Sequence, residues 1–176
     1  MNPRAIRVML MSGAFLAALI LCFAVALLVS GRVTAPSVPQ VATIGGPFQL
    51  TDQDERTVTD QDLKGRPFLV FFGFTHCPEI CPTALFEISE IFRKLGPDAD
   101  RARALFITVD PERDTPKLLK EYLSSFDPHV VGLTGDAEAI AAVAKAYRAI
   151  YRKVPLDQGG YTMDHTAIVY LMDKQG

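Results

Sequence analysis

The sequence has no excess of charge of either sign and no repeated or low-complexity tract. Its 176 residues include 18 Lys and Arg against 20 Asp and Glu, which gives a formal net charge of −2. A protein that binds phosphate backbones needs a basic face, so this balance excludes nucleic acid as a partner. The length and the 49% hydrophobic content are enough for one domain with a core and too little for two.

Cysteine is scarce, and only two of the three cysteines lie where they can cooperate. Cys22 lies within an uncharged run from Val8 to Val29, far from the other two. This run exceeds the ~18 apolar residues typical of a spanning helix, and at ~1.5 Å per residue it covers ~30 Å of hydrocarbon. We therefore predict a transmembrane anchor at residues 8–30 and a lipid-facing Cys22. The alternative is a cleavable signal peptide, whose apolar region is usually only roughly 7–15 residues long.

The charges that flank the anchor predict its orientation. Two arginines precede the run within residues 1–7, and only Arg32 follows it closely. The positive-inside rule then places residues 1–7 in the cytoplasm and everything beyond the anchor outside. Residues 31–45 are rich in Pro, Ser, Thr and Val, a composition that favours an extended tether. The folded domain, residues 46–176, is therefore expected on the extracytoplasmic side.

Strand and helix patterns alternate along residues 46–176. Unbroken apolar runs at 68–72 and 104–109 are typical of strands buried on both faces of a parallel sheet. Apolar residues at helical spacing over 82–95 predict a crossover helix between them. The sequence therefore predicts an α/β fold on one small sheet. Its other predicted elements are a hairpin within 46–58, a helix after Thr115, a strand at 130–133, a helix at 136–147 and a last strand at 166–172.

Cys77 and Cys81 lie where the first buried strand leads into the crossover helix. Pro82 suits the first position of that helix, so both sulfurs are expected at its N-terminus, where the helix dipole lowers the pKa of a cysteine. Their spacing is compatible with one helical turn, so the sulfurs can either share a metal ion or form a disulfide. A purely structural disulfide is disfavoured because so small a loop adds little stability.

A histidine ligand would favour metal binding over redox chemistry. His165 is the best placed of the three histidines, because we expect it at the start of the last strand, in a loop that closes over the cysteine turn. His76 adjoins Cys77 but points in another direction, which favours a role beside the thiolates rather than as a ligand. His129 follows a proline in a loop, and we expect it to face solvent. Two thiolates and one imidazole without a fourth strong ligand favour one copper ion, Cu(I) or Cu(II), over zinc.

Three motifs follow one another along the chain: FGFTHCPEICP at residues 72–82, TVDPERDTP at residues 108–116 and DHT at residues 164–166. In their order and spacing, these motifs resemble those of the Sco/SenC family. The resemblance extends from about Val38 to Gly176, and it implies a thioredoxin-like fold, a single membrane anchor, and copper held by Cys77, Cys81 and His165.

The resemblance also implies a function. It implies a protein similar to the assembly factors of cytochrome c oxidase subunit II. Such factors supply copper to the dinuclear copper centre of that subunit, or reduce the cysteines of the centre. We therefore predict a copper metallochaperone of the bacterial inner membrane with its soluble domain in the periplasm. One alternative is a thiol–disulfide oxidoreductase, in which Cys77 and Cys81 cycle between dithiol and disulfide and His165 is dispensable. Another is a peroxidase that attacks peroxide through a thiolate.

Two further expectations concern the second motif and the end of the chain. Asp110 lies at the C-terminal end of its strand, the edge where α/β sites form. We expect it either to orient the site or help a client dock, or to organise the turn into the next helix together with Asp114. The sequence ends at Gly176, where such sheets commonly continue with another strand and helix. Either a bare sheet edge or an incomplete sequence is expected there.

Overall fold

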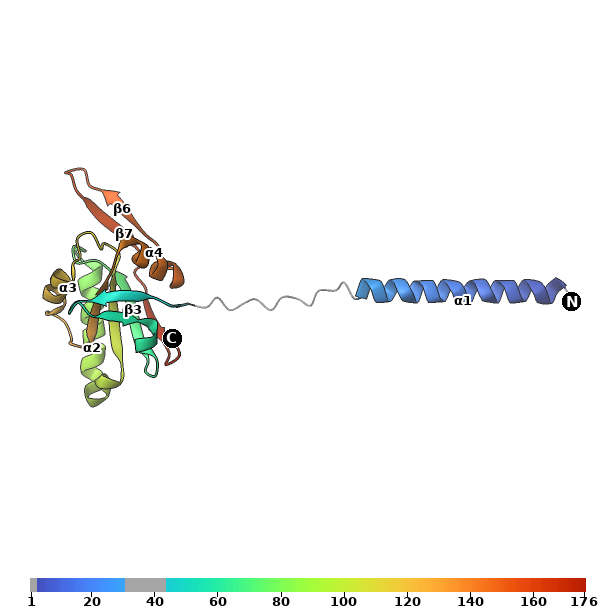
Figure 1. Cartoon of the computed structure of the whole chain (residues 1–176), viewed down its shortest axis with the longest axis horizontal. Helices are drawn as coiled ribbons and strands as arrows, with labels where there is room; N and C mark the ends of the chain where they lie inside the picture. The colour runs from blue at the N-terminus through green and yellow to red at the C-terminus, as the bar shows by residue number, and fades with distance from the viewer. Residues whose placement is uncertain (1–2, 31–43) are drawn as a thin grey trace. The chain divides into compact units, whose positions relative to one another are not determined.

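The computed structural model describes residues 3–30 and 44–176, and the chain divides into two compact units, 1–43 and 44–176 (Figure 1). In the first unit, α1 (Pro3–Ser30) is a single helix of 28 residues. The anchor predicted at residues 8–30 is not confirmed, since no helix of the described residues is long and apolar enough to cross a membrane. The predicted tether at 31–45 lies almost wholly outside the described residues.

Residues 44–176 fold around a six-stranded mixed sheet of order β2-β1-β5-β4-β3-β8. The strands β3, β4 and β5 are parallel, while β1 and β8 run antiparallel to their neighbours. The predicted strands at 68–72, 104–109 and 130–133 are confirmed as β3, β4 and β5, and the predicted hairpin is β1 and β2. The bounds are β1 (Gln49–Asp52), β2 (Thr57–Thr59), β3 (Phe68–Gly73), β4 (Arg103–Thr108), β5 (Val130–Thr134) and β8 (Val169–Met172).

The core is centred on β3 and β4, because both strands are apolar on both faces. Every residue of β3 except Leu69 is buried, and so is every residue of β4 except Arg103. Burial of one such large apolar side chain contributes about 1.5–3 kcal/mol, so these two strands are the most firmly held part of the sheet. The loops that leave their C-terminal ends therefore start from a rigid base.

Helices connect the strands as predicted, with one shift of boundary. Thr115 caps α3 by accepting a hydrogen bond from the N–H of Leu118, and Asp136 caps α4 in the same way. The crossover helix α2 begins at Ile80 rather than at the predicted Pro82, so Cys81 lies inside its first turn. The helices are α2 (Ile80–Leu95), α3 (Pro116–Leu123) and α4 (Ala137–Ala146), with short 3-10 helices η1 (Asp60–Leu63) and η2 (Gly96–Arg101).

A separate two-stranded sheet was not predicted. It is an antiparallel hairpin of β6 (Tyr151–Pro155) and β7 (Tyr161–His165). In its turn Gly159 and Gly160 have φ of 87° and 78°, a region that glycine adopts without strain. The predicted strand at 166–172 was wrong at its start, because β8 begins only at Val169. His165 therefore ends β7 instead of beginning the last strand.

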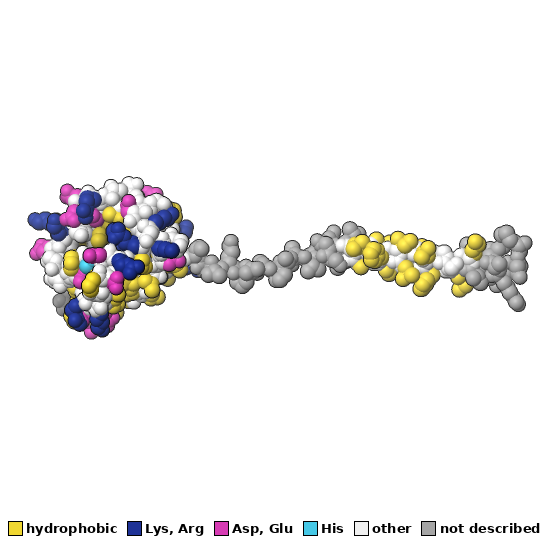
Figure 2. All heavy atoms as spheres, turned by 90° about the horizontal axis from the view of Figure 1, so that it is seen from below, with side chains coloured by type: hydrophobic (Ala, Val, Ile, Leu, Met, Phe, Trp, Pro, Cys, Tyr) yellow, Lys and Arg dark blue, Asp and Glu magenta, His cyan; other side chains and the backbone are white. Residues whose placement is uncertain are grey.

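Charged side chains of both signs are interspersed on the face of this unit that Figure 2 shows. Several form exposed pairs on the surface, such as Arg93 with Glu90 and Arg152 with Asp164. Exposed pairs of this kind contribute about 0–1 kcal/mol each, so they add more to solubility than to stability.

Candidate metal centre

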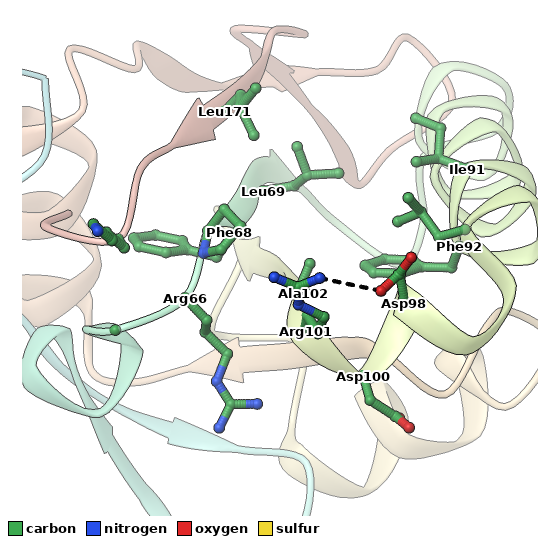
Figure 3. Close-up of a pocket in the computed structure, with 14 residues that line it drawn as sticks. Arg66, Phe68, Leu69, Ile91, Phe92, Asp98, Asp100, Arg101, Ala102 and Leu171 are labelled. Atoms are coloured by element: carbon green, nitrogen blue, oxygen red, sulfur yellow. Dashed lines mark hydrogen bonds and ion pairs between the residues drawn. The ribbon is translucent and has the colours of Figure 1, made fainter.

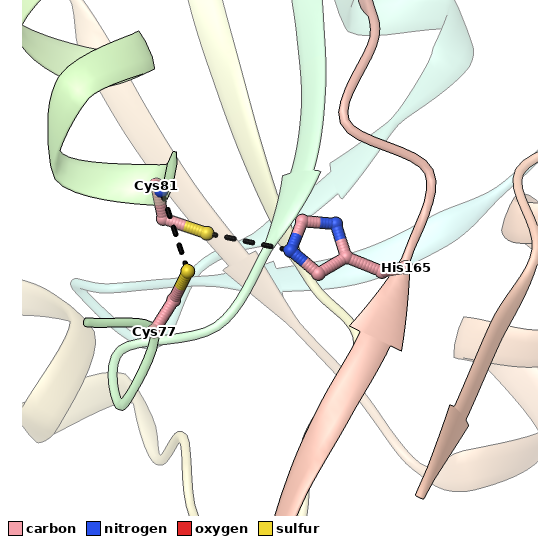
Figure 4. Close-up of side chains that lie close together, drawn as sticks. All are labelled: Cys77, Cys81 and His165. Carbon is pink, nitrogen blue, oxygen red and sulfur yellow. Dashed lines mark hydrogen bonds between the residues drawn. The ribbon is translucent and has the colours of Figure 1, made fainter. Parts of the chain in front are cut away.

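The two cysteines lie on a turn between the central strand β3 and the helix α2. The N–H of Cys77 donates to the carbonyl oxygen of Phe74 at 3.2 Å, which closes the turn. The N–H of Cys81 donates to Sγ of Cys77 at 3.4 Å, which draws that sulfur toward the first turn of α2 (Figure 4). The local backbone thus holds both sulfurs on the same side of the turn.

His165 reaches the cysteines from the end of β7, far away in the sequence. Its Nε2 lies 3.6 Å from Sγ of Cys81, and its Nδ1 lies 3.1 Å from the carbonyl oxygen of Thr166 (Figure 4). Because a carbonyl oxygen only accepts, Nδ1 carries the proton and Nε2 presents its lone pair to the sulfur. The rings of Phe71 and Phe74 pack edge-on against the imidazole, with centroids 6.3 and 5.7 Å away. Both the tautomer and the orientation therefore suit a metal ligand.

The structure brings the three predicted residues Cys77, Cys81 and His165 together. Their ligand atoms all lie within 4.8 Å of one another, and no other such group occurs among the described residues. Metal–sulfur bonds of ~2.3 Å and metal–nitrogen bonds of ~2.0 Å allow two ligands of one ion to lie up to roughly 4.6 Å apart. Small side-chain movements would therefore close this group on an ion. Two sulfurs and one imidazole are donors that favour a soft transition metal over magnesium or calcium.

The three donors differ in their access to solvent. Cys81 is 0% exposed, whereas Cys77 and His165 are partly exposed. Burial raises the pKa of the Cys81 thiol, and the neighbouring Cys77 and Asp114 raise it further. The predicted lowering of the pKa by the helix N-terminus is thus wrong for Cys81, because the loss of hydration outweighs the helix dipole. Binding of a metal ion would still deprotonate this thiol.

Cys77 and His165 open onto a groove of about 260 Å³ whose lining mixes apolar side chains with the carboxylates of Glu79 and Asp164. Cys81 is not part of this lining, so an incoming ligand meets the other two donors first. A larger groove of about 860 Å³ runs beside Phe68, Leu69 and Ile91, where Figure 3 shows the Arg101–Asp98 pair. That groove contains none of the three donors and is not part of the site.

Asp110 does not point its carboxylate at the donors. It is buried, accepts a hydrogen bond from the hydroxyl of Tyr161 at 2.8 Å, and forms an ion pair with Arg113. Its own N–H donates to the hydroxyl of Thr108 at 2.9 Å. Asp110 is therefore connected to β7, which carries His165.

His76 and His129 do not belong to the group of three donors. The Nδ1 of His76 is 3.0 Å from the hydroxyl of Thr75, and its side chain is 51% exposed. The solvent-facing role expected for His129 is wrong. Its imidazole stacks on Phe92 and contacts the carboxylates of Asp127 at 2.6 Å and Asp100 at 3.0 Å.

Sequence reasoning missed how Asp114 fixes the cysteine turn. Its buried carboxylate accepts from the N–H of Thr75 at 3.0 Å and from the Thr75 hydroxyl at 2.6 Å. It also accepts from the hydroxyl of Thr108 at 2.6 Å. The partner Thr75 lies 39 residues away, so no local pattern predicts this contact. The one signal in the sequence was the group of charges directly after a buried strand.

Comparison with known proteins decides the family. The SCO1/SenC family model matches residues 36–176. The chain belongs to the SCO1/SenC family. The resemblance found in the sequence is thus confirmed, and so is a thioredoxin-like α/β fold.

Several relatives are similar over the same part of the chain. The SCO2-like protein of Rickettsia prowazekii is 42% identical over 76% of this chain and 66% of its own length. The structure of Bradyrhizobium japonicum ScoI with copper bound is 63% identical, covers 76% of this chain and 85% of that one, and has a TM-score of 0.74. A structure of BsSco, described as a cytochrome c oxidase assembly protein with a disulfide switch, is 31% identical over 61% and 66% of the two chains, with a TM-score of 0.52. The match spans 40% of the length of an Arabidopsis thaliana relative and 66% of the Rickettsia protein.

Proposed function

We propose that this protein is a copper metallochaperone, which carries one copper ion as cargo on Cys77, Cys81 and His165. The observation that carries the proposal is the convergence of two sulfurs and an imidazole nitrogen within 4.8 Å. Copper in the related Bradyrhizobium structure and the description of BsSco as an oxidase assembly protein support it. As the recipient we propose the dinuclear copper centre of cytochrome c oxidase subunit II, which rests on the family resemblance.

The donors differ in their exposure to solvent, and this difference suggests how copper is transferred. On loading, each thiol gives up its proton and Nε2 of His165 binds through its lone pair. On delivery, a thiolate of the client enters the groove and replaces the exposed donors first, while Cys81 holds the ion from behind. The copper keeps its oxidation state, because one set of ligands simply replaces another. The ion has few ligands and faces the groove on one side, so the client can replace these ligands quickly. At no stage is the copper ion released into solution.

The test is copper binding by the full chain with His165 replaced. We expect one copper ion per chain and a thiolate-to-Cu(II) charge-transfer band, which His165→Ala removes or shifts. The control is His129→Gln at about pH 8, which removes a histidine whose imidazole contacts Asp100 and Asp127 and lies outside the group of donors. Copper binding and spectrum that are the same in His165→Ala as in the unmodified protein would refute the ligand assignment. To test the recipient, the copper-loaded protein is mixed with a purified subunit II domain. We expect copper to appear in the subunit II domain, and its absence there contradicts the proposed recipient.

A second candidate function is thiol–disulfide exchange with a client. The observation that favours it is that Cys77 and Cys81 are both free thiols and are linked by the 3.4 Å contact from the Cys81 N–H. Cys77 would attack a client disulfide, and Cys81 would then release the client as a dithiol and leave a Cys77–Cys81 disulfide. The two electrons pass to the client, so an external thiol reductant must restore the pair. Disulfide reduction that persists in His165→Ala, together with loss of its copper, separates this activity from copper binding.

We also propose that the chain is anchored in the bacterial inner membrane with residues 44–176 in the periplasm. This rests on the uncharged run from Val8 to Val29 and on the arginines before it. Alkaline extraction of membranes that contain the full chain tests it. We expect the protein to stay in the pellet, and release into the supernatant contradicts the proposal.

A further inference from the structure

The hairpin that carries His165 is not part of the main sheet. Among the described residues, strand β7 pairs with β6 alone, whereas the cysteine turn leaves the six-stranded sheet directly. The His165 end of β7 leads within a few residues into β8, which pairs with β3, so the main sheet restrains that end of the hairpin. The other end of β7, at Tyr161, has no such support and depends on other contacts.

One loop, residues 110–114 between β4 and α3, holds the start of β7. The hydroxyl of Tyr161 donates to Asp110 at 2.8 Å, and Nη1 of Arg113 donates to the carbonyl oxygen of Tyr161 at 3.1 Å. The guanidinium of Arg113 also lies 3.9 Å from the centre of the Tyr161 ring. A guanidinium over a ring face is attracted by the ring's π electrons, so three favourable contacts meet on this tyrosine.

The same loop holds β6 and the cysteine turn. Glu112 pairs with Lys153 of β6 at 2.5 Å. On the other side, Asp114 accepts two hydrogen bonds from Thr75, which precedes Cys77 by two residues. The loop is thus bonded to both halves of the donor group.

Arg113 is the centre of this connection. Besides Tyr161 it lies 5.9 Å from the ring of Phe74, which itself packs against His165 at a centroid distance of 5.7 Å. Its Nη2 is buried and has no hydrogen-bond partner among the described residues. The guanidinium is paired with the Asp110 carboxylate and packs against the rings of Tyr161 and Phe74. Any movement of this group would break these contacts, so its position is fixed.

We propose that Asp110 and Arg113 are positioning residues, which set the distance between His165 and the two sulfurs by tying β7 to the loop that also holds the cysteine turn. The inference rests on the proposed copper function. Without the connection, the Tyr161 end of β7 is released and the imidazole is no longer held in one orientation, while the two sulfurs keep their own geometry. Copper then binds more weakly and without its imidazole, although neither residue touches the ion.

The test compares Arg113→Ala with Arg152→Ala in the full chain. Arg152 is the matched control, because it forms an exposed ion pair with Asp164 on the same hairpin, beside His165, and no hydrogen bond or ion pair joins it to the 110–114 loop among the described residues. Two readouts are needed: Cu(II) binding with its charge-transfer band, and the nuclear Overhauser effect between the Phe74 and His165 rings in the metal-free protein. We expect Arg113→Ala to weaken copper binding about 10- to 100-fold and to give the band of His165→Ala. It should also lose the ring contact, while Arg152→Ala changes neither readout.

A wild-type band and a wild-type ring contact in folded Arg113→Ala overturn the proposal. If Arg113→Ala does not fold, Tyr161→Phe decides, because it removes only the hydroxyl that bonds Asp110. It should weaken copper binding about fivefold and reduce the ring contact, and no change in either refutes the positioning role. If the unmodified protein binds no copper, the proposed function fails, but the ring contact in the metal-free variants still decides whether the loop positions His165.

Discussion

Gly73, the last residue of β3, leaves the space that the sulfur of Cys81 occupies. A Cβ added there would lie 2.5 Å from the Phe106 ring and 2.9 Å from Sγ of Cys81, whereas real Cβ contacts essentially never fall below 3.0 Å. Both neighbours are 0% exposed, so neither can move into solvent. Overpacking of this kind costs about 1–3 kcal/mol, which at about 3–5 °C per kcal/mol lowers the melting temperature by roughly 3–15 °C. We therefore expect Gly73→Ala both to destabilise the protein and to displace a donor.

Gly73→Ala differs from an ordinary core mutation because it also displaces Sγ of Cys81. We expect Cu(II) binding to weaken at least about tenfold, which corresponds to roughly 1.4 kcal/mol, with a shifted charge-transfer band. Gly132→Ala in β5 is the control, because its added Cβ would lie 2.5 Å from Leu123 and touches no donor. It should lower the melting temperature and leave the copper band unchanged. Thermal melts and copper titrations of both variants decide, and a Gly73→Ala protein with the stability and band of the wild type refutes the reasoning.

Two further predictions concern stability. Thr115→Ala removes the cap of α3 and should cost about 1 kcal/mol of unfolding free energy in urea melts, while Thr115→Ser should restore most of it. Hydrogen bonds with Asp100 and Asp127 raise the pKa of His129, so its protonated form stabilises the fold below the unfolded pKa of about 6.5 and this contribution disappears as pH rises through the raised value. His129→Gln should therefore lower the unfolding free energy more near pH 5.5 than near pH 8.5, and an equal loss at both values contradicts the assignment.

Most of the fold could be predicted from the sequence because its core elements follow local rules. Unbroken apolar runs identified β3 and β4, and a threonine followed by proline identified the start of α3. The β6–β7 hairpin escaped prediction, although Gly159 and Gly160 mark its turn. Its strands are short and include only one buried residue, Met163, so their side chains carry no continuous apolar signal. The start of α2 was also missed, because Pro82 is tolerated at its third residue as well as at its first.

The grouping of Cys77, Cys81 and His165 could be predicted, but not what holds these side chains in place. Cysteine and histidine are few here and their chemistry is specific, so Cys77, Cys81 and His165 stood out without any structure. Arg113 and Tyr161 are common residue types whose contact spans 48 positions, and only the folded backbone brings them together. The pKa of Cys81 was misjudged for a related reason. A helix dipole can be inferred from sequence position, whereas the depth of burial that outweighs it cannot.

The division of the site between two supports fits the proposed function, in which the protein both holds copper and releases it. Cys81 is buried in the first turn of α2 and packed against the central strand, so its sulfur can move only if the core moves. Tyr161, at the other end of the strand that carries His165, is held by side-chain contacts that cost about 1 kcal/mol each to break. Under the proposed transfer mechanism, breaking them frees the imidazole without unfolding the domain. Strengthening these contacts should therefore slow copper transfer more than it tightens copper binding, which transfer rates and copper titrations of the same variant would measure.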